Sequence, residues 1–153
     1  MSRTTPLTYY EQFVVPNYED YLARAGDIRL CLNACVTASQ LADVVIAYCR
    51  AEDPARIAGW KTPKALRIEL RRRDPYFNTI QSAATAYKHL HAIGDHYQFA
   101  TTGSLQSVSV RHFGRMDVAY PQRDVIVWIK NGALVSLNAA LEAVVRKLWP
   151  PFL

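Results

Sequence analysis

The stretch Asp27–Arg50 constrains the fold of this chain more than any other part of the sequence. When it is read with helical periodicity, nearly all positions are apolar except one narrow strip, formed by Arg29, Asn33, Thr37, Gln40 and Arg50. A surface helix of a globular protein shows a narrower apolar stripe, so this helix must be enclosed by other elements. We therefore expect residues 27–50 to form a buried central helix.

Helical patterns flank this stretch on both sides. Before it, a short helix or turn is expected up to Pro16 and a second helix over residues 17–25, capped by Asn17. After it, Thr62-Pro63 is a favourable helix start, because a capping hydroxyl precedes a proline at the first helical position. A further helix is expected over residues 76 to about 93.

Beyond Asp95 the pattern becomes typical of strands. Residues 105–112 alternate between apolar and polar, and residues 123–130 form a β-branched and aromatic run. Asn131-Gly132 is a strong hairpin signal, so residues 133–137 would return antiparallel, with Trp128 beside Val135. These features predict a three-stranded meander.

The sequence thus predicts a mostly α protein, a helical bundle around residues 27–50 with a small antiparallel β-meander at about 105–137 before the C-terminal helix. With 153 residues and no repeat or linker, residues 1–153 are expected to form a single domain. The closing segment, Trp149 to Leu153, either folds back onto the core or forms an apolar patch that a second subunit covers.

The N-terminus lacks the apolar block of a secretory signal, so the protein is expected in the cytoplasm. The longest apolar run near the centre of the chain, Val44–Cys49, is far shorter than the ~20 residues that span a bilayer, so no membrane association is expected. In a reducing compartment, Cys31, Cys35 and Cys49 are expected to be buried thiols.

The net charge of +5 is concentrated in one segment. Residues 56–73 contain seven basic residues and one acidic residue, so this segment carries +6 and the rest of the chain about −1. Clustered Lys and Arg attract phosphate backbones, although a charged helix face is often only solvated. The predicted RNA- or polyanion-binding residues are Lys61, Lys64, Arg67, Arg71 and Arg72, of which the last four are expected on one side of a helix.

A polar strip on the helix that starts at Tyr76 is a second candidate site. Ser82 and His89 lie about 10 Å apart along a helix and cannot form a nucleophile–base pair, whereas Thr85 and His89 are neighbours. The strip either lines a cleft or is an exposed polar face. Its members are Asn78, Ser82, Thr85, Lys88 and His89.

A metal site and a catalytic centre are not predicted. His89 and His91 point about 160° apart on a helix, so they do not converge on one ion. The chain lacks the sequence signatures of hydrolases, P-loop proteins and dinucleotide-binding proteins. No catalytic residue and no cofactor are therefore assigned.

Three phrases, NACVTASQLADVV, TAYKHL and LEAVVRKLW, together with the order of elements over residues 13–149, resemble small bacterial helical proteins of the HEPN group. The resemblance implies a helical bundle, frequent dimerisation and RNA- or nucleotide-related roles. Active nucleases of the group carry an Arg four to six residues before a His, and no His here has one. Within the resemblance, Lys88-His89 is the polar pair that stands out.

Three hypotheses follow. The leading one is a non-enzymatic cytoplasmic protein that binds RNA or another polyanion through the basic helix. The second is a homodimer or other interaction module without a nucleic-acid role. The third is a hydrolase that uses His89 in a cleft with Asn78 and Thr85.

Overall fold

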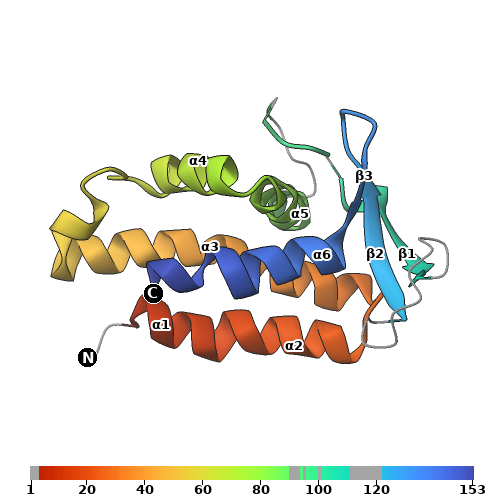
Figure 1. The fold of residues 1–153 in the computed structure, drawn as a ribbon, viewed down its shortest axis with the longest axis horizontal. Coiled ribbons are helices and arrows are strands. Elements are labelled where there is room, and N and C mark those ends of the chain that lie inside the picture. Colours follow the sequence, from red (N-terminus) through yellow and green to blue (C-terminus); the bar gives the residue numbers. More distant parts are fainter. Residues whose placement is uncertain (1–3, 90–93, 95, 100, 111–121) are drawn as a thin grey trace.

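The computed structural model describes residues 4–89, 94, 96–99, 101–110 and 122–153. These residues form a mostly helical protein with a small antiparallel sheet before the C-terminal helix, as the sequence predicts. Helices are stacked in layers, and the sheet lies across one end of them (Figure 1). The labels α and β below are those of Figure 1.

Helix α3 (Ile28–Glu52) runs through the centre of the molecule, which confirms the predicted central helix (Figure 1). The carboxylate of Asp27 caps it, because Asp27 Oδ1 accepts a hydrogen bond of 3.0 Å from the Leu30 N–H. Its buried side chains are Cys31, Leu32, Ala34, Cys35, Ala38, Ser39, Leu41, Ala42, Val45, Ile46 and Cys49. The three cysteines are free and buried, as predicted.

By length and composition alone, α3 is apolar enough to cross a membrane. The core helix of a folded protein passes the same test, and 56% of the most apolar part of α3 is buried within the molecule. Here most of the apolar side chains of α3 are buried against neighbouring elements.

The N-terminal residues, Pro6–Ala23, form one continuous helix, whereas the sequence predicts two short elements. Helix α1 (Pro6–Tyr9) continues through a π-helical segment (Tyr10–Val14) into α2 (Val15–Ala23). A proline inside a helix removes one hydrogen bond and crowds the carbonyl four residues earlier. The wider π-helical turn precedes Pro16 and accommodates it, because Val15 N–H bonds to Tyr10 O five residues back.

Helices α4 (Pro63–Arg73) and α5 (Tyr76–His89) cover the opposite side of α3. The predicted start of α4 is confirmed, since the Ala65 N–H donates to Thr62 Oγ1 at 3.1 Å and Pro63 is the first helical residue. In Figure 1, α5 is seen nearly end-on, so it crosses the direction of α3. The predicted extension of α5 over residues 90–93 lies outside the described residues.

The sheet has the strand order β1 (Leu105–Ser109), β2 (Arg123–Trp128), β3 (Leu134–Ser136), and both pairings are antiparallel. The meander is confirmed, but the predicted register of its hairpin is wrong by one residue, because Trp128 pairs with Leu134 and not with Val135.

The shift arises from the loop of the hairpin. The Ile129 N–H donates to Ala133 O and the Gly132 N–H donates to Ile129 O, which makes the loop three residues long. Gly132 has a φ of +84°, the left-handed conformation that closes such loops. The two-residue turn assumed from Asn131-Gly132 would have paired the strands one position later.

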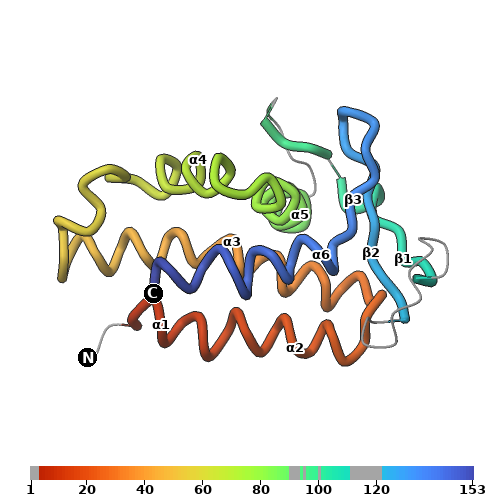
Figure 2. Tube along the Cα trace, in the orientation of Figure 1, coloured from red at the N-terminus to blue at the C-terminus, as the bar shows by residue number. Residues whose placement is uncertain are grey.

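The C-terminal helix consists of α6 (Leu137–Leu141) and a π-helical segment (Glu142–Leu148). The end of the chain folds back onto the core, which decides between the two alternatives for the closing segment. Trp149 is fully buried and its indole N–H donates to Ala38 O at 2.9 Å, while Phe152 is 6% exposed. Helix α1 and the C-terminus lie at the same end of the molecule (Figure 2).

Candidate functional site

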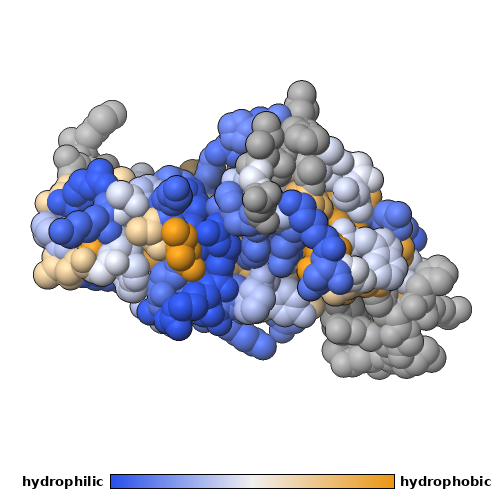
Figure 3. Space-filling view, turned by 90° about the horizontal axis from the view of Figure 1, so that it is seen from above, coloured by the Kyte–Doolittle hydropathy of each residue, from blue (hydrophilic) through white to orange (hydrophobic). Residues whose placement is uncertain are grey.

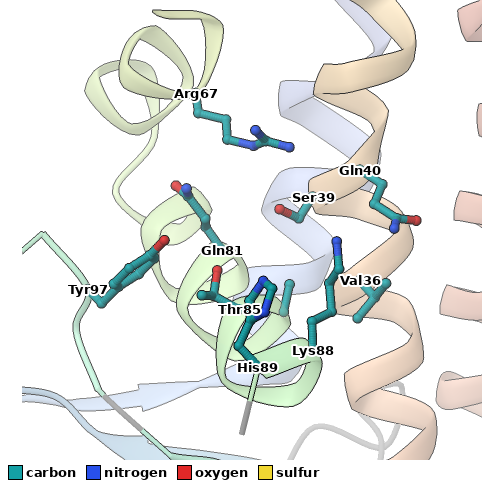
Figure 4. A pocket seen from close by; sticks show the side chains of 10 residues that line it. Val36, Ser39, Gln40, Arg67, Gln81, Thr85, Lys88, His89 and Tyr97 are labelled. Atoms are coloured by element: carbon teal, nitrogen blue, oxygen red, sulfur yellow. The ribbon is translucent and has the colours of Figure 1, made fainter. Parts of the chain in front are cut away.

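A pocket of about 560 Å³ opens where α3, α4 and α5 meet the segment that follows α5 (Figure 4). Its volume falls in the range of about 300–1,000 Å³ that is usual for small-molecule sites. The residues that line it are Val36, Ser39 and Gln40 of α3, Arg67 of α4, Gln81, Ala84, Thr85, Lys88 and His89 of α5, and Tyr97.

Two cationic side chains from different helices reach this pocket. The guanidinium of Arg67 forms an ion pair with Asp43 of α3, in which the Arg67 side chain is 21% exposed and the Asp43 side chain 52% exposed. The Asp43 carboxylate is half exposed, so water weakens its attraction to the largely buried Arg67 guanidinium. A guanidinium has five N–H donors, so Arg67 can contact a second anion in the pocket while it stays paired with Asp43.

Lys88 is the second cation, and it is exposed. It forms neither a hydrogen bond nor an ion pair with any residue that the structure describes. The described residues that line the pocket include no Asp or Glu. Asp43 offsets the charge of Arg67, so the charge of Lys88 makes the pocket net positive.

Arg71 is partly buried and does not line the pocket itself, but it contacts a residue that does. Its Nη1 donates to Gln81 Oε1 at 2.8 Å, and Gln81 lines the pocket. Burial lowers the pKa of the Arg71 guanidinium, the nearby Tyr97 opposes this effect, and the charge of Arg67 adds to it. Among the residues described here no carboxylate pairs with Arg71, so a partly desolvated cation is held by a neutral amide.

The predicted basic face of α4 is only partly exposed in the structure. Arg67 and Arg71 turn toward α3 and α5, whereas Lys64 and Arg72 are exposed. The four positions span about 140° of the helix at 3.6 residues per turn, and one edge of that arc meets the neighbouring helices.

The outer part of α4 is largely hydrophilic in the view from above, with a small hydrophobic patch among the polar residues (Figure 3). Arg72 is bound to Glu69 by hydrogen bonds of 2.9 and 2.7 Å. Lys61 is exposed before α4, and its carbonyl accepts a hydrogen bond of 2.9 Å from Arg50. The cations of this outer surface do not converge on one point.

The polar strip of α5 also splits into two groups. Thr85, Lys88 and His89 line the pocket, as the cleft interpretation requires. Asn78 and Ser82 lie outside its lining and hold the following segment against α5. The Asn78 amide donates to His96 O at 2.9 Å, and Ser82 Oγ accepts from the Gln98 N–H at 3.0 Å.

This arrangement separates the groups proposed for a hydrolase. His89 and Thr85 share the pocket, but the Asn78 side chain is bound to the His96 carbonyl. His89 makes no hydrogen bond with the part of the chain that the structure describes, so no orienting group for a catalytic imidazole is seen there. Within the described ranges, no three His, Cys, Asp or Glu side chains come together as metal ligands do.

Six lining residues were not singled out as site residues by the sequence. Two of them are apolar, Val36 and Ala84, and the other four are Ser39, Gln40, Gln81 and Tyr97. Gln40 belongs to the polar strip of the central helix, which was a usable signal, and its Oε1 accepts a hydrogen bond of 3.1 Å from the Tyr9 hydroxyl. Gln81 is a buried polar residue on a helix face that also carries alanines. Tyr97 follows α5 in an irregular segment, where periodicity carries no information.

Comparison of the chain with family models, with curated proteins and with solved structures finds no match.

Proposed function

We propose that the protein binds RNA or another phosphate-bearing polyanion at the pocket between α3, α4 and α5. The observation that carries this proposal is the environment of Arg71, a partly buried guanidinium whose described hydrogen-bond partner is the neutral amide of Gln81. Removing a charge from water is unfavourable unless an opposite charge compensates for it. A phosphate bound in the pocket that Gln81 lines brings a compensating negative charge toward Arg71.

Arg67 and Lys88 supply the direct contacts in this proposal. Arg67 contributes a planar guanidinium, which matches the geometry of phosphate oxygens and keeps N–H donors beyond those that bind Asp43. Lys88 contributes an ammonium without a described partner. Phosphate contacts of this kind release counterions, so binding should weaken as the salt concentration rises.

The role proposed here agrees with the RNA-related roles that the HEPN-like resemblance implies. It moves the contact surface from the outer face of α4 to the pocket beside it, because the structure directs Arg67 and Arg71 inward. Dimerisation, which the same resemblance implies, stays a prediction.

The test is the affinity of the protein for a fluorescently labelled single-stranded RNA, measured by anisotropy at low salt. Arg71→Gln and Lys88→Gln, made separately, are each expected to lower the affinity at least about tenfold, since hydrogen bonds to charged groups contribute about 1.5–3 kcal/mol each. Lys147→Gln is the matched control, because Lys147 is exposed in the C-terminal helix, away from the pocket lining.

Lack of measurable RNA binding by the unmodified protein at low salt would contradict the proposal. An equal loss of affinity in the Lys147→Gln variant would also contradict it, because the effect would then reflect net charge and not the pocket.

A further inference from the structure

The pocket is larger than a phosphate group requires. Its volume of about 560 Å³ leaves most of the space unfilled when only a phosphate is present. It is also too small for a duplex or a folded strand, since it has the size of a small-molecule site. One nucleotide unit is the part of a nucleic acid that fits this volume.

The lining separates charge from aromatic surface. In Figure 4 the Arg67 guanidinium and the Lys88 ammonium lie toward the α3 side, near Ser39 and Gln40, whereas Tyr97 lies on the opposite side. Rings of this kind provide a face on which a nucleobase can stack, and such stacking tolerates any base. A ligand with a phosphate at one end and a ring at the other matches this separation.

The two glutamine amides add hydrogen-bond donors to the lining. Gln81 Oε1 already accepts from Arg71, and Gln40 Oε1 already accepts from the Tyr9 hydroxyl. One lone pair of each oxygen is thus engaged, and the two NH₂ groups add donors to the pocket. Together with Arg67 and Lys88, they make the pocket rich in donors, which suits phosphate oxygens and the carbonyl oxygens of a base.

From these observations we infer that the pocket holds a single nucleoside 5′-monophosphate, either free or at the 5′ end of an RNA strand. The phosphate lies between Arg67 and Lys88, and the base lies against Tyr97. This inference rests on the proposed function and narrows it, because it replaces a general polyanion surface with recognition of one nucleotide.

Calorimetric titration of the whole protein with four probes tests the inference. The probes are UMP, ribose 5-phosphate, uridine and inorganic phosphate. Relative to UMP, ribose 5-phosphate lacks the base, uridine lacks the phosphate, and inorganic phosphate lacks the whole nucleoside. UMP is expected to bind at least about tenfold more tightly than each of the other three, since stacking of one base is worth about that factor and uridine lacks the charged phosphate contacts. Equal affinities for UMP and ribose 5-phosphate would overturn the inference, because the base would then make no contact.

Variants separate the two ends of the ligand. Tyr97→Leu is expected to reduce the affinity for UMP about tenfold and to leave that for ribose 5-phosphate unchanged, whereas Tyr97→Phe, which retains the ring, keeps the affinity for UMP. Lys88→Gln is expected to reduce the affinity for both UMP and ribose 5-phosphate, whereas the control Lys147→Gln is expected to change neither affinity. Loss of ribose 5-phosphate binding in Tyr97→Leu would contradict a stacking role and overturn the assignment of Tyr97.

Competition between UMP and labelled oligouridine distinguishes a free nucleotide from the 5′ end of an RNA strand. It also separates failure of this inference from failure of the proposed function. Displacement of UMP by 5′-phosphorylated but not 5′-hydroxyl RNA supports recognition of a strand end. Displacement by neither supports a free nucleotide and contradicts the proposed binding of RNA in the pocket. If RNA binds at low salt and UMP at millimolar concentration does not displace it, the single-nucleotide inference fails while the proposed function stands. If RNA does not bind at all, the proposed function fails.

Discussion

Trp149 stabilises the fold through both its ring and its indole N–H. It is fully buried, and its N–H donates to the Ala38 carbonyl of α3 at 2.9 Å. Trp149→Ala is expected to lower the free energy of unfolding by about 3–5 kcal/mol, because it leaves a cavity in the core. Urea unfolding followed by circular dichroism measures this change.

Trp128 provides the matched control, since its side chain is 59% exposed on β2. Trp128→Ala is expected to change the free energy of unfolding by less than about 0.5 kcal/mol. Similar effects of the two substitutions would show that the C-terminal segment is not packed as described.

Glu69 titrates at an unusually low pH. Hydrogen bonds from Arg72 and then Arg73 lower the pKa of its carboxyl from 4.5 to about 2. Because the pKa is lower in the folded than in the unfolded state, the stabilisation is present above pH ~4.5 and is lost as the pH falls toward 2. NMR titration of the Glu69 carboxyl should therefore give a midpoint near 2, and Arg72→Gln should move this midpoint upward. A midpoint near 4.5 in the unmodified protein would contradict these ion pairs.

At this scale, the sequence was informative where the interaction is local. The caps formed by Asp27 and Thr62 involve residues three positions apart, and the one at Thr62 was predicted. The inward direction of Arg67 and Arg71 was not, because it depends on where α3 and α5 lie relative to α4. Helical periodicity places side chains around one helix and does not show which edge of it is covered.

At the scale of elements, the turn between α2 and α3 requires glycine. Gly26 has a φ of +91°, and a Cβ at this position would lie 2.8 Å from Arg123 Cβ and 2.9 Å from Ser107 Oγ of the sheet. Gly26→Ala is expected to reduce the free energy of unfolding by more than about 1 kcal/mol, through the left-handed backbone and the close contacts. Thermal and urea unfolding measure it.

Gly59 offers the contrasting substitution. No atom lies within 4 Å of a Cβ built there, and its backbone is not left-handed. Gly59→Ala is expected to be neutral or to stabilise the protein by up to about 1 kcal/mol, because it restricts the unfolded chain. If Gly26→Ala were as well tolerated, the contact between this turn and the sheet would be refuted.

The predictions of elements failed where backbone geometry departs from the regular forms. Pro16 was interpreted as a break between two helices, but the π-helical turn before it keeps one helix continuous. Asn131-Gly132 was interpreted as a two-residue turn, but the loop has three residues. In both places the residue types were recognised correctly, and the local hydrogen bonding decided the geometry.

For the whole molecule, the apolar circumference of α3 was sufficient to predict the layered architecture. A helix of this kind needs neighbours on all sides, and the structure provides α2, α5 and α6. The pocket was not predictable in the same way, because it joins Gln40, Arg67, Lys88 and Tyr97, which are far apart in the sequence. It contains one residue of the candidate site on α4, Arg67, and three of the candidate site on α5, Thr85, Lys88 and His89.

The most direct test of the pocket as the binding site compares two lysines that carry the same charge. Lys88 lines the pocket, and Lys64 is exposed at the start of α4. In RNA titrations over a series of salt concentrations, Lys88→Gln should weaken binding about tenfold and reduce the slope of log K against log salt by about 0.7, whereas Lys64→Gln should change neither appreciably. A larger effect of Lys64→Gln than of Lys88→Gln would contradict binding in the pocket and assign it to the outer face of α4.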